Sequence, residues 1–176
     1  MSLVLVATPG ASNANTYATK AEASAVGGYF ESRLFTTTWT GATVADRNAA
    51  LVWATTILDD WVDWTGSRVD DDQSLRWPRY SVEDKDGWTV DSDSIPEFLK
   101  NATSELAMHL LGGDPTDAPD TLGFTRLKVS SLELEVDKTD RDSETTIPDH
   151  VKAMIEPYYG TVRSRGTGGV AKLQRA

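Results

Sequence analysis

The clearest helical pattern of apolar positions lies between residues 43 and 62. Its apolar residues repeat at separations of three, four and seven, which places them on one buried face of a helix. These residues are Leu51, Ala54, Ile57, Leu58, Trp61 and Val62. Thr43-Val44-Ala45-Asp46 precedes them with the order of a capping motif, so the pattern predicts that a long amphipathic helix begins there.

A similar start signal occurs earlier in the chain. Thr19-Lys20-Ala21-Glu22 has the capping-box order, in which a threonine oxygen and a glutamate carboxylate satisfy free amides at a helix start. We therefore expect a first helix that runs from there to about Leu34. Gly27-Gly28 inside it should cost roughly 1 kcal/mol each relative to alanine, which predicts a closely packed partner at that point.

Two further helices share an Ile-Pro opening. Ser94-Ile95-Pro96-Glu97 and Thr146-Ile147-Pro148-Asp149 each place proline at the predicted first helical position and an acid near the positive end of the dipole. The first of these helices should end at Gly112-Gly113, and the second is short because it meets Pro157. The expected core face of the first consists of Phe98, Leu99, Ala102, Leu106 and Leu110.

Strand patterns occur in two places. Leu3-Val4-Leu5-Val6 is a short β-prone run that turn-forming residues end. Between Phe124 and Lys138, apolar residues alternate with acids, which is typical of a strand with one buried face. Ser130-Ser131 interrupts this segment, so we expect a short hairpin or a bent strand.

The predicted fold is therefore mainly α. It is a small bundle of about four helices with a short β-hairpin or strand pair and an extended C-terminal arm. A length of 176 residues fits one domain, which we place at residues 1–160. Residues 161–176 are glycine-rich and basic, and we expect them to form a flexible arm.

The charge of the chain disfavours nucleic-acid binding by the folded body. Seventeen basic residues face 27 acidic ones, and four of the basic residues lie in the tail: Arg163, Arg165, Lys172 and Arg175. Residues 1–162 thus carry 13 basic and 27 acidic side chains, a net charge of −14. Phosphate backbones bind to clustered Lys and Arg, so an acidic body repels them.

Composition also narrows the compartment and the chemistry. The chain has no cysteine, which excludes disulfides, a thiol nucleophile and the common structural zinc sites. Its longest early apolar run, Leu3–Ala7, is too short for a signal peptide or a membrane span. We expect a protein that is soluble and cytosolic when made.

Two acidic segments invite comparison with metal sites. Asp84-Lys85-Asp86-Gly87 resembles part of a calcium loop, but Val82 falls where the first aspartate must be, and a plain turn is the simpler interpretation. Asp70-Asp71-Asp72 is typical of a solvated loop. The two histidines, His109 and His150, sit in no closely spaced ligand pattern. We predict no catalytic residue, no cofactor and no metal.

Six tryptophans exceed what one small core needs. Trp61 fits the buried stripe of the long helix, whereas Trp53 and Trp64 fall off it. Exposed aromatics can stack on single-stranded bases, but such platforms normally lie in a basic groove, and Asp59, Asp60 and Asp63 surround these residues. The pattern favours a contact surface for a protein partner.

The segment Ser74–Gly87 contains the most distinctive local sequence, Trp-Pro-Arg. We interpret it as a scaffold. Leu75 and Trp77 are expected to be core or interface anchors, and Pro78 holds the residue before it extended. Arg76 and Arg79 are expected to pair with acids of the loop. The remaining structural anchors that we predict are Gly87, at a turn, and Pro96, at a helix start.

Several motifs occur together in a known order. These are Asn13-Ala14-Asn15-Thr16-Tyr17, an early Ala/Glu-rich segment ending near Tyr29-Phe30, Gln73–Arg79, Asp86-Gly87 and Ile95-Pro96. Over about residues 3–160 the chain resembles the tailed-bacteriophage family of DnaT-like single-stranded-DNA-binding proteins. Members of that family in turn resemble the head–tail adaptor, or head completion, proteins of siphophages and myophages.

The adaptor resemblance implies a structural role at the head–tail interface of a virion. Such proteins are mostly helical and form a ring, commonly of twelve copies, beneath the portal protein. They contact a tail-side stopper, collar or tail terminator protein, and DNA passes through the lumen without specific binding. The chain would be made in the host cytoplasm. The tail residues that we expect to contact a partner are Arg163, Arg165, Val170, Lys172, Leu173 and Arg175.

Two other functions stay open at this point. One is single-stranded-DNA binding, which the family resemblance and the tryptophans favour. The other is an enzyme or metal-binding module, which only the acidic loops favour. The sequence leaves the subunit number, the neighbouring proteins and the face that lines a channel undetermined.

Overall fold

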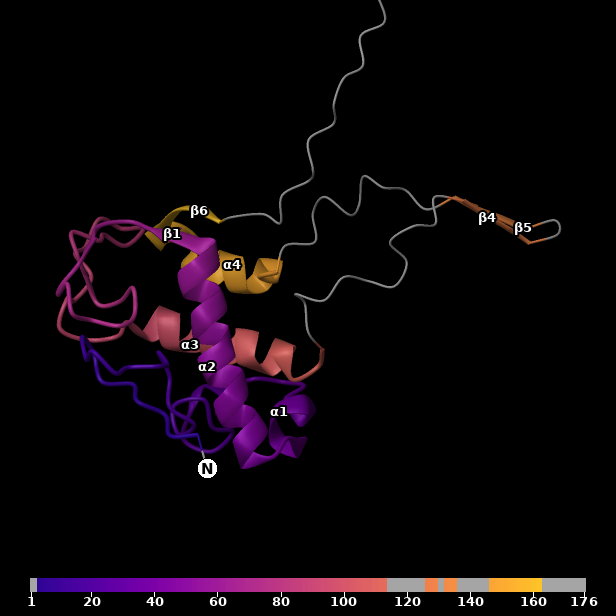
Figure 1. The fold of residues 1–176 in the computed structure, drawn as a ribbon, viewed down its shortest axis with the longest axis horizontal. Helices are drawn as coiled ribbons and strands as arrows, with labels where there is room; N and C mark the ends of the chain where they lie inside the picture. The colour runs from indigo at the N-terminus through magenta and orange to yellow at the C-terminus, as the bar shows by residue number, and fades with distance from the viewer. Residues whose placement is uncertain (1–2, 114–125, 130–131, 136–145, 163–176) are drawn as a thin grey trace, which may run out of the picture.

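The computed structural model of the chain describes residues 3–113, 126–129, 132–135 and 146–162. As predicted, the fold is mainly α, with four α-helices and short antiparallel strand pairs (Figure 1). The helices are α1 (Thr37–Gly41), α2 (Val44–Trp61), α3 (Glu97–Leu110) and α4 (Asp149–Ile155). The described ranges also contain two 3-10 turns, η1 (Tyr29–Glu31) and η3 (Glu156–Tyr158). No helix in the described ranges is long and apolar enough to cross a membrane.

Helix α2 follows the prediction closely. The Thr43 hydroxyl accepts a hydrogen bond of 3.1 Å from the Asp46 amide, so the expected cap is present. Leu51, Ala54, Ile57 and Leu58 are buried. Helix α2 crosses and packs against α3, which in turn packs against α4 (Figure 1). The apolar stripe thus places α2 over the core.

The helix predicted from Thr19 to Leu34 is wrong. Both capping-box bonds form, from the Thr19 amide to Glu22 Oε2 (2.7 Å) and from the Glu22 amide to Thr19 Oγ1 (3.2 Å). The chain then turns at Gly27, whose φ of +71° is the left-handed conformation that glycine tolerates. The Tyr29 amide reaches back to the Glu22 carbonyl at 2.7 Å. The segment forms turns that lead to η1, and the short α1 was not predicted.

Both Ile-Pro openings do start helices. Pro96 and Pro148 are the N-cap residues of α3 and α4, one position earlier than predicted, and their carbonyls accept the first helical bonds. Leu99, Ala102 and Leu106 are buried as expected, whereas Phe98 and Leu110 are half-buried. Helix α3 ends before Gly112-Gly113.

Strands form three antiparallel pairs in the described residues. β1 (Val62–Trp64) pairs with β6 (Tyr159–Val162), and β2 (Ser67–Arg68) pairs with β3 (Arg79–Tyr80). The predicted hairpin is confirmed as β4 (Arg126–Val129) paired with β5 (Leu132–Glu135). Because β6 ends at Val162, regular structure extends two residues past the predicted domain boundary at 160.

The predicted strand at Leu3–Val6 does not form. Instead, the Asn15 side chain bonds this segment, since its Oδ1 accepts from the Val6 amide (2.8 Å) and its Nδ2 donates to the Val4 carbonyl (2.9 Å). A side chain therefore supplies the hydrogen bonds that a neighbouring strand would have supplied.

Aromatic residues fill much of the core. The largest buried side chains include Trp39, Trp77, Tyr17 and Phe30, each at most 1% exposed. Trp64 is 8% exposed, so the prediction that it lies off the buried surface is wrong, because β1 turns its side chain into the core after α2 has ended.

Candidate functional site

The Trp-Pro-Arg segment is built into the core. Trp77 makes edge-to-face contacts with Trp64 (5.6 Å between ring centroids) and Phe98 (5.5 Å), and the ring of Phe98 stacks on Tyr158 at 3.6 Å. Trp77 is therefore the anchor that the sequence predicted, while Leu75 is half-buried beside the core. The Trp77-Pro78 peptide bond is cis.

Arg79 has a different role from the predicted pairing with loop acids. Its guanidinium is buried and donates to backbone carbonyls, including those of Thr65 (2.6 Å), Gly66 (2.6 Å) and Arg76 (3.1 Å). Burial lowers the pKa of Arg79. The side chain thus fixes the turn between β1 and β2 against β3. Within the described ranges, Arg76 also forms no ion pair with an acid.

A buried tyrosine joins the N-terminal segment to α2 and to the Trp-Pro-Arg segment. We call Tyr17, Asp59 and the backbone amides that they bind the Asp59 cluster. The Tyr17 hydroxyl donates to Asp59 Oδ1 and accepts from the amides of Arg76 (3.1 Å) and Trp77 (3.3 Å). The Arg76 amide also donates to Asp59 Oδ2 at 3.1 Å. Burial raises the pKa of Asp59 to about 6, although the Tyr17 hydrogen bond acts in the opposite direction.

A second buried carboxylate joins three elements at the other end of the core. We call Glu105 and the side chains of Tyr29, Arg33 and His150 around it the Glu105 cluster. Glu105 Oε1 on α3 accepts from the Tyr29 hydroxyl (2.9 Å) and from Arg33 Nε (2.7 Å), and its side chain is 3% exposed. His150 on α4 places Nε2 3.7 Å from Glu105 Oε2. Oε2 is buried and has no hydrogen-bond partner in the structure.

Sequence reasoning missed both clusters. One signal was available for Glu105, since Ala102, Glu105 and His109 follow one another at separations of three and four on α3, which puts an acid on a mostly apolar face. For Asp59 the sequence holds no such signal, because its partner Tyr17 lies 42 residues away in an irregular segment.

The loop after β3 confirms the predicted turn at Gly87. Gly87 has φ +83°, and its amide donates to the Asp84 carbonyl at 3.0 Å. The carboxylate Oδ1 of Asp84 accepts from the amides of Asp86 (2.9 Å) and Trp88 (2.8 Å). The Asp84 carboxylate therefore organises the turn.

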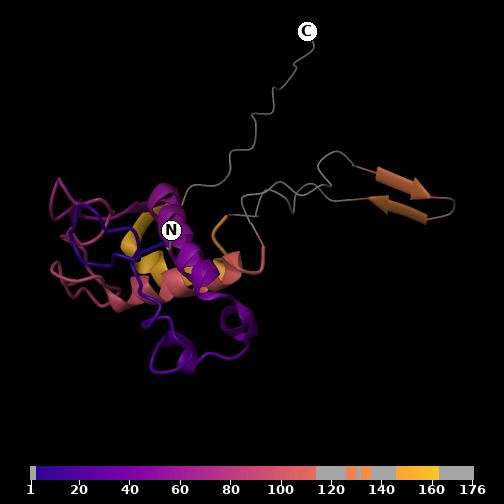
Figure 2. The same cartoon turned by 60° about the horizontal axis from the view of Figure 1, so that its bottom comes forward.

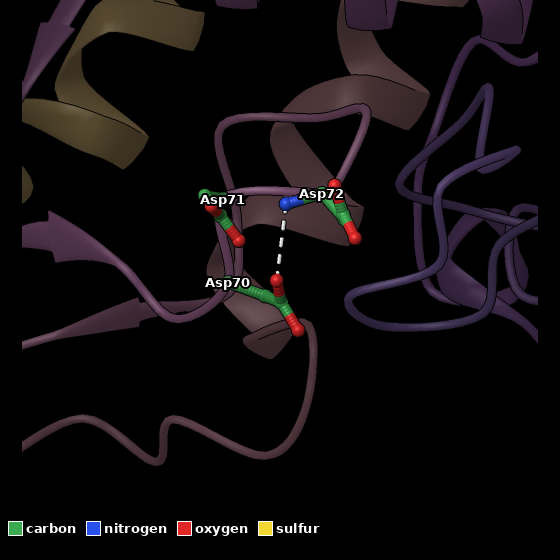
Figure 3. Close-up of side chains that lie close together, drawn as sticks. All are labelled: Asp70, Asp71 and Asp72. Atoms are coloured by element: carbon green, nitrogen blue, oxygen red, sulfur yellow. Dashed lines mark hydrogen bonds between the residues drawn. The ribbon is translucent and has the colours of Figure 1, made fainter.

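Asp70, Asp71 and Asp72 form an exposed acidic cluster between β2 and β3. Within the described ranges it is the only group of three potential metal ligands whose ligand atoms lie within 4.8 Å of one another. The Asp70 carboxylate accepts from the Asp72 amide at 3.0 Å, so the hydrogen bond within the cluster serves to make a turn (Figure 3). Acids exposed in this way are common at turns.

Three of the most exposed apolar side chains lie in one short segment. Within Val26–Phe35, Val26, Leu34 and Phe35 are 83%, 73% and 86% exposed. Phe35 has φ +59°, a conformation that bulky residues rarely adopt and that is often kept for function. The chain around η1 and α1 projects from the larger helices (Figure 2). We call Val26–Phe35 the apolar loop.

The tryptophans divide between core and surface. Trp53 and Trp88 are 45% and 74% exposed, whereas Trp39, Trp64 and Trp77 are buried. Trp61, which was expected on the buried stripe of α2, is only half-buried against the core. Three of the six tryptophans are therefore core, and Trp53 and Trp88 are the exposed ones that remain for the contact surface that the sequence suggested. The predicted tail contacts Arg163, Arg165, Val170, Lys172, Leu173 and Arg175 lie outside the described residues.

Comparison with known proteins gives one family. Its description is "Putative DnaT-like ssDNA binding protein", and its profile matches residues 1–176 of the chain. No curated protein and no solved structure matches the chain. The family part of the resemblance seen in the sequence is thereby confirmed, and the match itself contains nothing about a head–tail adaptor.

Proposed function

The chain belongs to the family of DnaT-like ssDNA binding proteins, and from that premise we propose that it is a structural virion protein of a tailed bacteriophage. In this proposal copies of the chain form a ring, commonly of twelve, that connects the portal protein of the head to a tail-side stopper, collar or tail terminator protein. The ring continues the DNA channel. Its place is the head–tail interface, and the chain is made in the host cytoplasm.

The observation that carries the proposal is an apolar loop on an acidic body. Three apolar side chains that are 73% to 86% exposed within ten residues form a candidate contact surface for a protein partner. A protein partner, or a second copy, would remove them from solvent. The strained backbone at Phe35 holds one of these side chains outward.

Charge supports a connector over a DNA-binding body. Residues 3–113 contain eight Lys or Arg and sixteen Asp or Glu, a net charge of −8. Some of the basic groups are already engaged, since Arg33 pairs with Glu105, Lys100 pairs with Glu22 at 2.7 Å, and Arg79 is buried among carbonyls. A lumen lined by such a body would repel the DNA phosphates, so DNA would pass without sticking.

The basic tail has a place in the same proposal. Residues 163–176 carry four basic and no acidic side chains, with Val170 and Leu173 as apolar positions. We assign to them the contact with the portal or with a neighbouring copy, because opposite charge favours docking on an acidic surface. The tail follows directly on β6, which is fastened to β1.

Single-stranded-DNA binding is the second candidate, and two observations favour it: the description of the family and the exposure of Trp53 and Trp88. Bases could stack on these rings. The carboxylate of Asp84 lies next to Trp88, as its hydrogen bond to the Trp88 amide shows, and Lys85 is the basic residue closest in sequence. This environment is unfavourable for a phosphate backbone.

Native mass spectrometry separates the two candidates. The full chain is measured alone, with the portal protein from the same genome, and with a single-stranded oligonucleotide at low salt. A connector gives a ring, or copies recruited onto the portal, and ignores the oligonucleotide. A chain that ignores the portal and binds the oligonucleotide would overturn the proposal in favour of the second candidate.

Variants test whether the apolar loop and the C-terminal tail make the contacts of the assembly. Val26→Ser with Phe35→Ser should reduce assembly, and a chain ending at Val162 should lose recruitment by the portal. Trp53→Ala with Trp88→Ala is the matched comparison, because base stacking in the second candidate would depend on these two exposed rings. Reduced oligonucleotide binding in this double variant, with unchanged assembly, is the signature of the second candidate.

A further inference from the structure

The two histidines of the chain lie on neighbouring helices, although the sequence places them 41 residues apart. His109 lies near the end of α3 and His150 near the start of α4, and these two helices pack against each other. Glu105, whose carboxylate is buried, lies one helical turn before His109 on α3, and its Oε2 is 3.7 Å from His150 Nε2.

Glu105 holds one oxygen free at this place. Its Oε1 accepts two hydrogen bonds, from Tyr29 and Arg33, while Oε2 is buried without a hydrogen-bond partner. A buried carboxylate oxygen that lacks a donor is unfavourable and calls for a ligand. The two bonds to Oε1 also fix the carboxylate, as second-shell donors do for ligating carboxylates.

The distance between Oε2 and His150 Nε2 suits an ion between them. At 3.7 Å the two atoms are too far apart for a hydrogen bond. Two ligand atoms that each lie about 2.0–2.1 Å from a tetrahedral zinc ion are about 3.3 Å apart. A small closing movement of the half-exposed His150 ring would reach that geometry.

We propose that Glu105, His150 and His109 form a binding site for a divalent transition-metal ion such as Zn²⁺, with water as the fourth ligand. Two imidazoles and one carboxylate are a ligand set that zinc uses in proteins. Glu105 and His109 stand one turn apart on the same face of α3. The three ligand atoms do not all lie within 4.8 Å of one another, so the exposed His109 ring must rotate to complete the site.

The proposed ion would join α3 to α4 and, through Tyr29 and Arg33, to the turn at η1. Its role is structural and is independent of the connector function. Arg33 is the feature that limits the affinity, because its positive charge lies against the same carboxylate. An ion of the hard type, such as Mg²⁺, prefers oxygen ligands and should avoid two imidazoles.

The test is isothermal titration calorimetry of the full, tag-free chain with ZnCl₂ at pH 7, followed by MgCl₂. We expect one equivalent of zinc to bind. His109→Ala and His150→Ala should each weaken binding by roughly tenfold or more. Both histidines are exposed, so these variants should fold. Asp71→Asn is the matched control in the acidic cluster, and it should leave zinc binding unchanged.

Three outcomes would overturn the site: no zinc binding by the wild-type chain, unchanged affinity in either histidine variant, or a loss of affinity in Asp71→Asn. Nitrogen-15 NMR of the two imidazoles gives a second measurement that does not depend on the variants. Zinc should shift one ring nitrogen of each histidine at one equivalent. Titration of only one ring would also contradict the three-ligand site.

Discussion

The Asp59 cluster and the Glu105 cluster are two solutions to one problem. Each places a carboxylate from a long helix against the hydroxyl of a tyrosine from the irregular N-terminal segment. Glu105 has a counter-charge, since Arg33 donates to it at 2.7 Å. The hydrogen bonds of Asp59 come from a tyrosine and a backbone amide, and its pKa rises to about 6.

The difference teaches how each cluster depends on its tyrosine. Tyr17 is fully buried, and its hydroxyl serves three partners at once. Tyr29 is half-buried, and Arg33 donates a second hydrogen bond to the same carboxylate oxygen of Glu105. Because Asp59 forms no ion pair within the described residues, the hydroxyl is its main partner, so loss of the hydroxyl leaves several buried groups unsatisfied.

The largest expected difference between the two clusters is the loss of stability when the tyrosine hydroxyl is removed. Tyr17→Phe leaves Asp59 Oδ1 and the Trp77 amide without a partner and should lower the free energy of unfolding by about 3 kcal/mol. Tyr29→Phe should lower it by about 1 kcal/mol, because Arg33 still bonds Glu105 Oε1. Urea unfolding of both variants measures the two values, and equal losses would show that burial of the hydroxyl does not decide the outcome.

The second prediction removes the charge of Glu105. Glu105→Gln keeps the shape of the side chain and loses the charge-assisted bond to Arg33, which should lower the free energy of unfolding by about 2 kcal/mol at pH 7. Arg33→Gln should produce part of the same loss. If the double variant loses the sum of both values, the two residues are not coupled and the ion pair contributes nothing.

The sequence predicts α2 well and the N-terminal segment poorly, and the two capping motifs explain why. Thr43 and Thr19 both form their cap bonds. Only Thr43 is followed by an apolar stripe that the core can bury, and burial is what extends a helix beyond its first turn. After Thr19 the chain reaches Gly27 and turns, so a correct local signal gave a wrong helix.

The candidate sites were predictable only where they are local. The turn at Gly87 and the anchor Trp77 follow from neighbouring residues. The backbone carbonyls that bind Arg79 reach its guanidinium only because the turn between β1 and β2 lies against β3. The contact of Glu105 with His150 likewise requires α4 to pack on α3. Such contacts depend on the tertiary arrangement, which spacing along one segment does not contain.

The third prediction concerns the pH dependence that Asp59 gives to the stability of the folded state. The pKa of Asp59 is about 6 in the folded state, above its ordinary value of 3.8. Between these values the folded state binds more protons than the unfolded state, so stability falls as pH rises from about 4 to 6. We expect a loss of about 2 kcal/mol from this group over that range.

Asp59→Asn is the measurement for this prediction. The variant should match the wild type near pH 4 and exceed its stability at pH 7, whereas Glu105→Gln is less stable than the wild type at pH 7. Denaturant unfolding at half-unit steps from pH 4 to 7 gives both curves. An Asp59→Asn curve parallel to that of the wild type would show that Asp59 does not titrate in this range.

The smallest expected effect is that of salt. Arg33 is partly exposed, so 1 M NaCl should screen its pair with Glu105 and weaken stability by roughly 0.5 kcal/mol. The Asp59 cluster is held by a hydroxyl and backbone amides and should not respond. Comparing the salt response of the wild type with that of Arg33→Gln isolates the pair, and identical responses would contradict the assignment.

The pairing of β1 with β6 has a consequence for how the chain folds. Val62 lies opposite Val162, so this short ladder closes a loop of 100 residues that contains α3, α4 and the β4–β5 hairpin. Contacts of such long sequence separation form slowly, and we expect the ladder to close last. The entropy of closing a loop grows only with the logarithm of its length, about 0.6 kcal/mol for a doubling. Evolution can therefore lengthen or exchange the chain between α3 and α4 with little loss to the rest of the molecule.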